Sequence, residues 1–235
     1  INLAGAGLAD RRWTLAYKRE IRASRVDLTD DLVAWMSEKK TPPKRLISGS
    51  AIGFYGADAQ ATFTEEAALG SGFSAELCHA WEAAAATAVH AGIEVTCLRL
   101  GVVLAKEGGA LSRMTQSFRM GMETWLGSGD QWLSWVHLDD VVRVILYALT
   151  APSVSPVYNT VAPEPVRHRQ FAREVGARSF TLLSAGVPAF VARLLAGEMA
   201  DELLLSGQHV VPAQLTNEGF TFRFPTLSDA LSDLL

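Results

Sequence analysis

Cysteine, long apolar runs and blocks of like charge are all scarce in this sequence of 235 residues. The only two cysteines, Cys78 and Cys97, show neither a Cys-x-x-Cys nor a Cys/His spacing, which argues against a metal site or a disulfide framework. We therefore expect two reduced thiols and a cytoplasmic location. No apolar run reaches the ~20 residues that cross a bilayer, so the sequence does not indicate a membrane protein.

Charge and aromatic residues point away from large polyanionic partners. The net charge is only −4, and acidic and basic residues are scattered along the whole chain. The aromatic residues are dispersed and lack flanking basic residues, which argues against nucleic-acid binding. The composition therefore does not indicate nucleic acid or a membrane surface as a partner, and the oligomeric state stays open.

The apolar pattern indicates alternating helices and strands. Residues 17–36 and 73–90 carry apolar side chains at helical spacing, whereas 45–52 and 93–104 are typical of strands. The second strand does not alternate cleanly, as expected when both faces of a sheet are covered. This rhythm predicts an α/β fold, a doubly wound, Rossmann-like parallel sheet with helices on both sides.

The regular alternation of strands and helices ends in the last third of the chain. A helix is expected to begin at Pro188, with Leu194 and Leu195 on its inner face. We assign residues 1–180 to the Rossmann-like domain and 181–235 to a small, mostly helical C-terminal domain.

Two helix starts carry capping signals. Asp139-Asp140 can cap a helix over 141–149. The run Thr226-Leu227-Ser228-Asp229 resembles a capping box that opens the last short helix.

Small residues gather where the expected strands end. Asn2-Leu3-Ala4-Gly5 would lie at the carboxyl end of one strand, and Ser48-Gly49-Ser50 at the end of the next. Open α/β sheets bind ligands at that edge, and an Ala/Gly turn lets a ligand approach the backbone closely. The sequence therefore indicates a ligand site along these strand ends.

Several segments form an ordered set along the chain. They are Asn2-Leu3-Ala4-Gly5, Ala9-Asp10-Arg11-Arg12-Trp13, Ile47-Ser48-Gly49-Ser50-Ala51, Tyr55-Gly56, Leu77-Cys78 to Trp81-Glu82, Leu98 to Leu104, Gly127-Ser128-Gly129, Trp135 to Val141 and Val157-Tyr158-Asn159. This order resembles the extended short-chain dehydrogenases of the nucleotide-sugar epimerase type. It resembles more closely the bacterial YfcH-like epimerase family proteins, which carry a small C-terminal domain of unknown function. The resemblance covers essentially the whole chain.

The resemblance implies a dinucleotide cofactor, NADP with NAD as the alternative, lying across the strand ends. No residue of the sequence decides between the two. The family's Gly-x-x-Gly-x-x-Gly turn, which gives the diphosphate a helix N-terminus, does not occur in this sequence. We expect about 60 further residues before Ile1, by analogy with the ~30-residue βαβ unit. The cofactor contacts that the resemblance implies are Asn2, Leu3, Ala4, Gly5, Ser48, Gly49, Ser50, Arg99, Gly101 and Val102.

The superfamily's usual proton-transfer residues are missing. That reaction uses a Tyr hydroxyl as general acid/base, with a Lys four residues later. Counting back from Glu82 places Ser74 and Cys78 at these positions, and the neighbouring register gives Phe73 and Leu77. Neither pair can perform the transfer. Cys78 as a nucleophile would need a lowered pKa, and a buried thiol is the simpler interpretation.

Other residues are candidates for the missing roles. Ser50 matches the family's serine, and Tyr55 either presents its hydroxyl or packs beneath the turn. His137 is a candidate general base, although its two acidic neighbours are better explained as helix caps. Arg12-Trp13 is either a clamp for an anionic or planar substrate or a surface pair.

The resemblance, together with the missing Tyr and Lys, leaves two functions open. The first is an NADP(H)-binding, nucleotide-sugar-epimerase-like oxidoreductase of unknown substrate, with Ser50, Tyr55 and His137 as catalytic candidates. The second is a non-catalytic dinucleotide-binding module that senses redox state or scaffolds a partner. Loss of Tyr and Lys with intact strand ends is what the second reading predicts.

Overall fold

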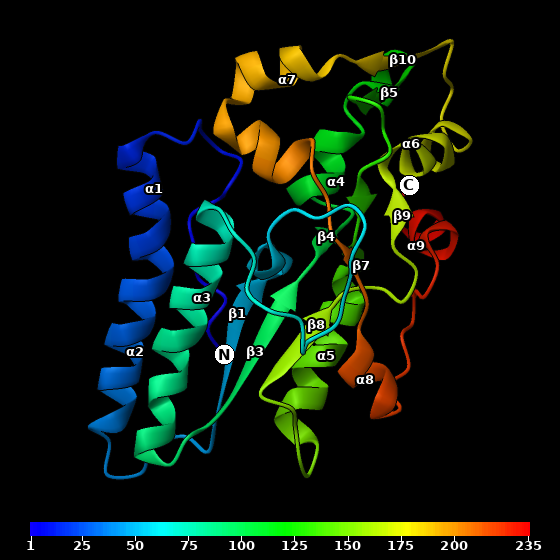
Figure 1. Ribbon diagram of the computed structural model, residues 1–235. Helices are drawn as coiled ribbons and strands as arrows, with labels where there is room; N and C mark the ends of the chain where they lie inside the picture. The colour runs from blue at the N-terminus through cyan, green and yellow to red at the C-terminus, as the bar shows by residue number, and fades with distance from the viewer.

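A parallel sheet forms the centre of the computed structural model, which describes residues 1–235 (Figure 1). Strands β1 (Arg45–Ala51), β3 (Glu94–Leu100) and β8 (Val157–Thr160) lie in the order β1-β3-β8. Asn2 forms a further parallel bridge with Ser48 on the free side of β1. The predicted parallel α/β sheet is confirmed.

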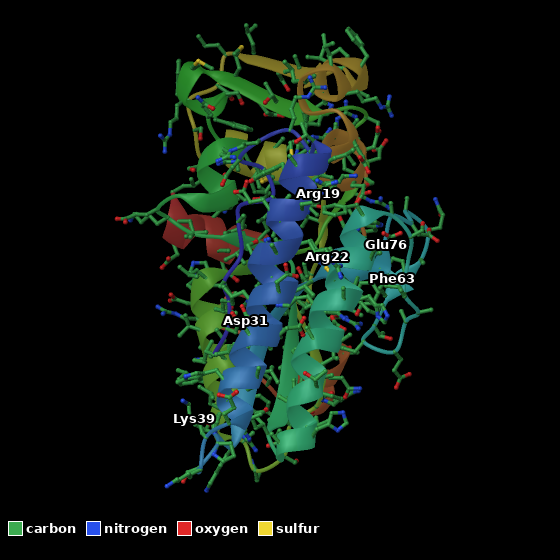
Figure 2. The ribbon with its side chains drawn as sticks, turned by 90° about the vertical axis from the view of Figure 1, so that its left-hand side faces the viewer. Arg19, Arg22, Asp31, Lys39, Phe63 and Glu76 are labelled. Carbon is green, nitrogen blue, oxygen red and sulfur yellow. The ribbon has the colours of Figure 1, made fainter.

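Helices cover the sheet. Helix α1 (Leu15–Arg22), a π-helical turn (Ala23–Asp27) and α2 (Leu28–Ser37) form a continuous rod that ends before Pro42-Pro43. Figure 2 shows this rod beside α3 (Phe73–Ala86). Helix α5 (Leu138–Thr150) is the remaining long helix at the sheet.

Adjacent strand residues assign the helices to opposite faces. Leu46 and Cys97 pack in one cluster with residues of α2 and α3. Their neighbours Ile47 and Leu98 pack in another cluster with Val144 of α5. Because successive strand side chains point to opposite faces, the sheet is covered on both sides, as a doubly wound fold requires.

The strand expected over 93–104 is divided at Gly101. Strand β4 (Val102–Leu104) leaves the central sheet and pairs with β7 (Trp135–His137). A Cβ atom on Gly101 would lie 2.5 Å from the carbonyl oxygen of Ser134, so only glycine fits this close approach.

Short elements complete the chain. Strand β2 (Thr62–Phe63) pairs with β11 (His209–Val210), β5 (Met122–Leu126) with β10 (Leu183–Val187), and β6 (Trp132–Leu133) with β9 (Val166–Arg167). The remaining α-helices are α4 (Gly109–Met114), α6 (His168–Gly176), α7 (Ala189–Ala196), α8 (Ala213–Asn217) and α9 (Leu227–Leu234). None of the helices has the length and apolarity needed to cross a membrane.

The C-terminal segment shares its core with the rest of the chain. Leu231 of α9 packs in one cluster with Leu104, and Leu215 of α8 packs in another with Leu98. Met199 joins a third cluster that contains Trp13. Residues 181–235 therefore add strands and helices to several parts of the molecule rather than enclosing a separate core.

Helix α7 has the opposite orientation to the one expected. Leu194 and Leu195 are 72% and 68% exposed, so their predicted place on the inner face is wrong. Ala192 and Ala196 are buried instead, in the cluster that contains Trp13. Small side chains let the helix approach its neighbours closely, which turns the leucines outward.

The two capping predictions have different outcomes. Helix α5 begins at Leu138, where the imidazole Nδ1 of His137 accepts a hydrogen bond from the Asp139 N–H at 3.0 Å. The predicted Asp139-Asp140 cap is therefore wrong. The Thr226 capping box is confirmed, because its hydroxyl accepts from the Asp229 N–H and donates to the Asp229 carboxylate.

Candidate functional site

The small residues at the strand ends lie along one edge of the sheet. The Asn2 N–H donates to the Ile47 carbonyl, and the Gly49 N–H donates to the Asn2 carbonyl, both at 2.8 Å. Ser50 lies beside Arg99 in the parallel register of β1 and β3, and Gly101 follows directly after β3. The structure thus brings Asn2, Ser50 and Gly101 to the same carboxyl edge, as the sequence indicates.

The first of these segments is exposed. Leu3, Ala4 and Gly5 are open to solvent, whereas Asn2 is buried and donates through its amide to the Thr29 hydroxyl at 2.9 Å. Ser48 and Gly49 are also buried, so the accessible part of this edge is the backbone after Asn2. A flat or extended ligand could lie against it.

Arg25 adds a positive charge to this edge that sequence reasoning missed. Its guanidinium donates to the Ala6 carbonyl at 3.0 Å and lies over the Trp81 ring at 5.4 Å. A Cβ on Gly5 would lie 2.7 Å from its Cζ, so glycine makes room for it. Burial lowers the pKa of Arg25. Nothing in the pattern of the helix that carries it distinguishes Arg25 from its exposed basic neighbours.

Ser50 is held by a buried ion pair. Its hydroxyl donates to Glu82 Oε1 of α3 at 2.6 Å, and Ser50 itself is 2% exposed. The two Glu82 oxygens accept from Arg99 Nε and Nη2, both at 2.8 Å. This two-point contact is the strong form of the Arg–carboxylate interaction. The single hydroxyl hydrogen of Ser50 is therefore committed to Glu82.

Arg99 is a structural residue rather than an open cofactor contact. It is 4% exposed, and its Cζ lies 3.4 Å from the centre of the Phe54 ring. Burial by itself would lower the pKa of Arg99, but the hydrogen bonds and charge of Glu82 outweigh it and raise the pKa. Because its donors already have partners, the expected cofactor contact through this side chain is not supported by its geometry.

Tyr55 continues the same network. Its hydroxyl donates to Asn159 Oδ1 at 2.6 Å and accepts from Arg99 Nη1 at 2.9 Å. Burial raises the pKa of Tyr55, and the neighbouring arginine only partly opposes this. Of the two readings of Tyr55, the packed aromatic describes its surroundings, with the hydroxyl held inside the fold.

Ser74 and Cys78 face the turn that follows β1. A Cβ on Gly53 would lie 3.1 Å from Ser74 Cβ and 3.8 Å from Cys78 Sγ. The Ser74 hydroxyl oxygen is buried without a hydrogen-bond partner. Burial raises the pKa of Cys78 to about 11, so its thiol is protonated at neutral pH and is a poor nucleophile.

His137 has a different environment from Ser50 and Tyr55. One ring nitrogen caps α5, and the ring stacks on Phe224 with centroids 3.9 Å apart. Its Nε2 lies 3.4 Å from Asp233 Oδ2 of α9. The side chain is thus enclosed by the C-terminal segment, and this placement does not favour the predicted general base.

The two residues of the proposed Arg12-Trp13 clamp lie in different environments, one at the surface and one in the core. Trp13 is buried, donates from its indole to the Leu8 carbonyl at 2.9 Å, and meets Phe73 edge to face. Arg12 is exposed and lies beside Gly197 of the turn after α7. Only Arg12 is therefore open to a ligand.

Sequence reasoning also missed two acidic residues. Glu82 belongs to a quoted segment, but a lone glutamate on an alanine-rich helix usually lies on a solvated face. The Glu65 carboxylate accepts from the Asn159 N–H at 2.9 Å and from the Gln214 N–H, which ties β8 to α8. The importance of both carboxylates follows from their hydrogen-bond partners, which are distant in the sequence.

Comparison with known protein families gives two matches. Residues 1–161 match the NAD dependent epimerase/dehydratase family. Residues 187–234 match a domain of unknown function, DUF1731.

Named relatives match nearly the whole chain. Epimerase family protein ML0860 of Mycobacterium leprae is 38% identical over 232 residues, which are 99% of this chain and 75% of the relative. The chloroplastic epimerase family protein SDR39U1 homolog of Arabidopsis thaliana is 38% identical over 237 residues, 100% of this chain and 67% of that protein.

A solved structure also superimposes on almost all of the chain. The crystal structure of human epimerase family protein SDR39U1 (isoform2) with NADPH has a TM-score of 0.92 and 30% sequence identity. The match covers 99% of this chain and 80% of the human one.

Proposed function

Because this chain belongs to the NAD dependent epimerase/dehydratase family, we propose that it binds NADP(H) and acts as a nucleotide-sugar-epimerase-like oxidoreductase on an unknown small molecule. The single observation that carries the proposal is that Asn2, Ser50 and Gly101 meet at the same carboxyl edge of the sheet. That edge is where open α/β folds bind ligands. The similarity to a human protein solved with NADPH supports the choice of cofactor.

The residues at the edge fit one end of a dinucleotide. The small side chains of Ala4 and Gly5 leave the exposed backbone accessible, and Arg25 supplies a nearby positive charge. The contacts would come from residues 3–5, from Ser50, and from Gly101 and Val102, both half-buried. When bound, the cofactor supplies hydride chemistry.

Ser50 would act on a ligand as a hydrogen-bond acceptor. Its hydrogen is directed to Glu82 at 2.6 Å, so only the oxygen lone pairs remain for a ligand, and because Ser50 is 2% exposed its neighbours have to move before a ligand reaches them. A substrate hydroxyl can donate to such an oxygen, whereas a substrate carbonyl cannot. The site is therefore better suited to orienting an alcohol than to polarising a carbonyl.

A non-catalytic dinucleotide-binding module is the second candidate. The observation that favours it is that two candidate groups beside Ser50 are not free to transfer a proton. The Tyr55 hydroxyl is enclosed by Arg99 and Asn159, and the Cys78 thiol is held protonated by burial. Such a module would keep the cofactor site and lose turnover.

NADPH titration tests the binding site. Ala4→Asp places a negative charge on the exposed segment and should weaken NADPH binding at least roughly tenfold, since 1.4 kcal/mol corresponds to that factor. Ala59→Asp, in an exposed loop, is the matched control and should leave binding unchanged. Unchanged affinity in Ala4→Asp would show that the cofactor site is elsewhere.

Turnover then separates the two candidates. Hydride transfer is measured with a panel of nucleotide sugars, alcohols and carbonyls, in the wild type, Ser50→Ala and Tyr55→Phe. Turnover that Ser50→Ala abolishes supports the oxidoreductase. Tight NADPH binding with no turnover on any compound supports the module.

The cellular location belongs to the same proposal. We expect a cytoplasmic protein, on the ground of its two unpaired cysteines. The Arabidopsis relative, by contrast, is named as chloroplastic. Fractionation of cells that express the intact protein tests this expectation.

A further inference from the structure

One end of the molecule carries large apolar side chains that nothing covers. We call it the α7–β10 face, and Figure 1 shows both of its elements along the upper end of the molecule. Each of its side chains is 66–80% exposed. The face consists of Phe180, Leu182, Leu183, Phe190, Leu194 and Leu195.

Helix α7 buries its small apolar residues and exposes its large ones. Its buried positions are the alanines Ala192 and Ala196, and its exposed positions include Phe190 and Leu194, four residues apart on one side. The larger apolar residues of this helix thus point away from the protein's own core. A surface helix normally shows the reverse arrangement.

Strand β10 presents an open edge beside this helix. It pairs in parallel with β5 and has no strand on its other side. Leu183, Ser184, Ala185 and Gly186 are all exposed. Edge strands with apolar residues and no charge readily pair with another chain.

The near-absence of charge on this face indicates what kind of partner it fits. Residues 179–197 contain a single charged side chain, Arg193, which pairs with Asp201 at 2.8 Å, whereas the whole chain is 20% charged. A strongly charged partner would find no complementary charge here. Two copies of a neutral face can meet without repulsion, which favours a second copy of the same chain.

The exposed area agrees with that choice. The six side chains present on the order of 700 Å², taking aromatic side chains as about 150–250 Å² and leucines as slightly smaller. The largest apolar patch of a typical monomer is about 300–600 Å². A standard protein–protein interface buries about 800 Å² per partner, so these six side chains alone would supply most of such an interface.

We propose that the α7–β10 face is the contact between two copies of this chain. A two-fold dimer uses the same patch on both subunits, so a neutral, self-complementary surface is what it requires. Antiparallel pairing of the two β10 edges would satisfy their free backbone groups. The Phe190–Leu194 ridges would pack against each other. The inference does not depend on cofactor binding or turnover.

Sedimentation velocity of the intact protein tests the proposal over a range of concentrations. The wild type should sediment as a dimer. Leu194→Asp and Leu183→Asp, on the helix and the strand, should each halve the apparent mass. Val89→Asp, in the turn after α3, is the matched control, because Val89 is 54% exposed outside the face, and it should remain dimeric. Circular dichroism establishes that each variant is folded.

Three results would overturn the proposal. One is a wild type that stays monomeric at every concentration. Another is a dimer that persists in both folded Asp variants. The third is a monomeric wild type that floats with phosphatidylcholine vesicles, which would identify the face as a lipid contact instead.

Discussion

Replacing Glu82 by alanine should destabilise the protein far more than its single carboxylate suggests. Glu82 lies between Ser50 and Arg99, and its side chain is only 13% exposed. Its loss leaves the Arg99 guanidinium buried without a counter-charge, because the side chain of Arg99 is 5% exposed. It also leaves the Ser50 hydroxyl without its acceptor.

The expected loss follows from these contacts. Breaking a buried ion pair by removing one partner costs about 3–5 kcal/mol. The lost hydrogen bond from the Ser50 hydroxyl to this charged carboxylate adds about 1.5–3 kcal/mol. The total is about 4.5–8 kcal/mol, and for a chain of this size each kcal/mol shifts Tm by about 2–4 °C, so Glu82→Ala should lower Tm by roughly 9–32 °C.

Thermal and urea unfolding, followed by circular dichroism, measure this loss. The matched control is Glu94→Ala, which removes an ion pair with Arg45 at 2.6 Å whose carboxylate is 45% exposed. That exposed pair should contribute less than about 1 kcal/mol. The double variant Glu82→Leu with Arg99→Met should be more stable than Glu82→Ala, because no buried charge remains unpaired.

The reasoning fails if Glu82→Ala and Glu94→Ala lose the same stability. It also fails if the double variant is the less stable one, because the penalty would then not come from an unpaired buried charge. Equal m-values in urea across the variants are needed for these comparisons.

Three further predictions test other parts of the fold. Gly101→Ala forces a Cβ against a carbonyl oxygen and should destabilise by about 1–3 kcal/mol, whereas Gly5→Ala meets only a flexible arginine and should cost less. Asp140→Ala leaves two backbone N–H groups of the C-terminal segment without acceptors and should speed limited proteolysis there by a protease that cuts after Arg or Lys. Burial raises the pKa of Cys78 to about 11, so the folded protein should resist iodoacetamide at pH 7. Because a raised pKa stabilises the fold only while the group is protonated, stability should fall as the pH rises above about 9, and less steeply in Cys78→Ala.

The spacing of apolar residues in the sequence made much of the sheet predictable. The strands and helices of residues 17–104 follow from apolar spacing, because local pattern and burial agree there. The break at Gly101 was not predictable, since it depends on the approach of Ser134, which is distant in the sequence. The orientation of α7 was missed for a related reason. Hydrophobicity alone placed Leu194 inside, whereas small residues decided the packing.

The location of the site could be predicted from the sequence, whereas the roles of its individual residues could not. Strand ends bring Asn2, Ser50 and Gly101 together because parallel strands share a carboxyl edge. The roles of Tyr55 and His137 depend on contacts with residues distant in the sequence, Arg99 and Asn159 for Tyr55 and Phe224 for His137, which no local pattern encodes. Such long-range contacts decide whether a titratable group is free or held.

A paired polar network occupies this edge of the sheet, in a chain that lacks the superfamily's usual Tyr and Lys. Glu82 of α3 and Arg99 of β3 neutralise each other, and through Ser50, Tyr55 and Asn159 they join β1, α3, β3 and β8. A fully paired network of this kind makes an edge rigid, but it leaves no free charge for proton transfer. Loss of Glu82 should accordingly disturb ligand orientation and stability together, rather than remove a catalytic acid.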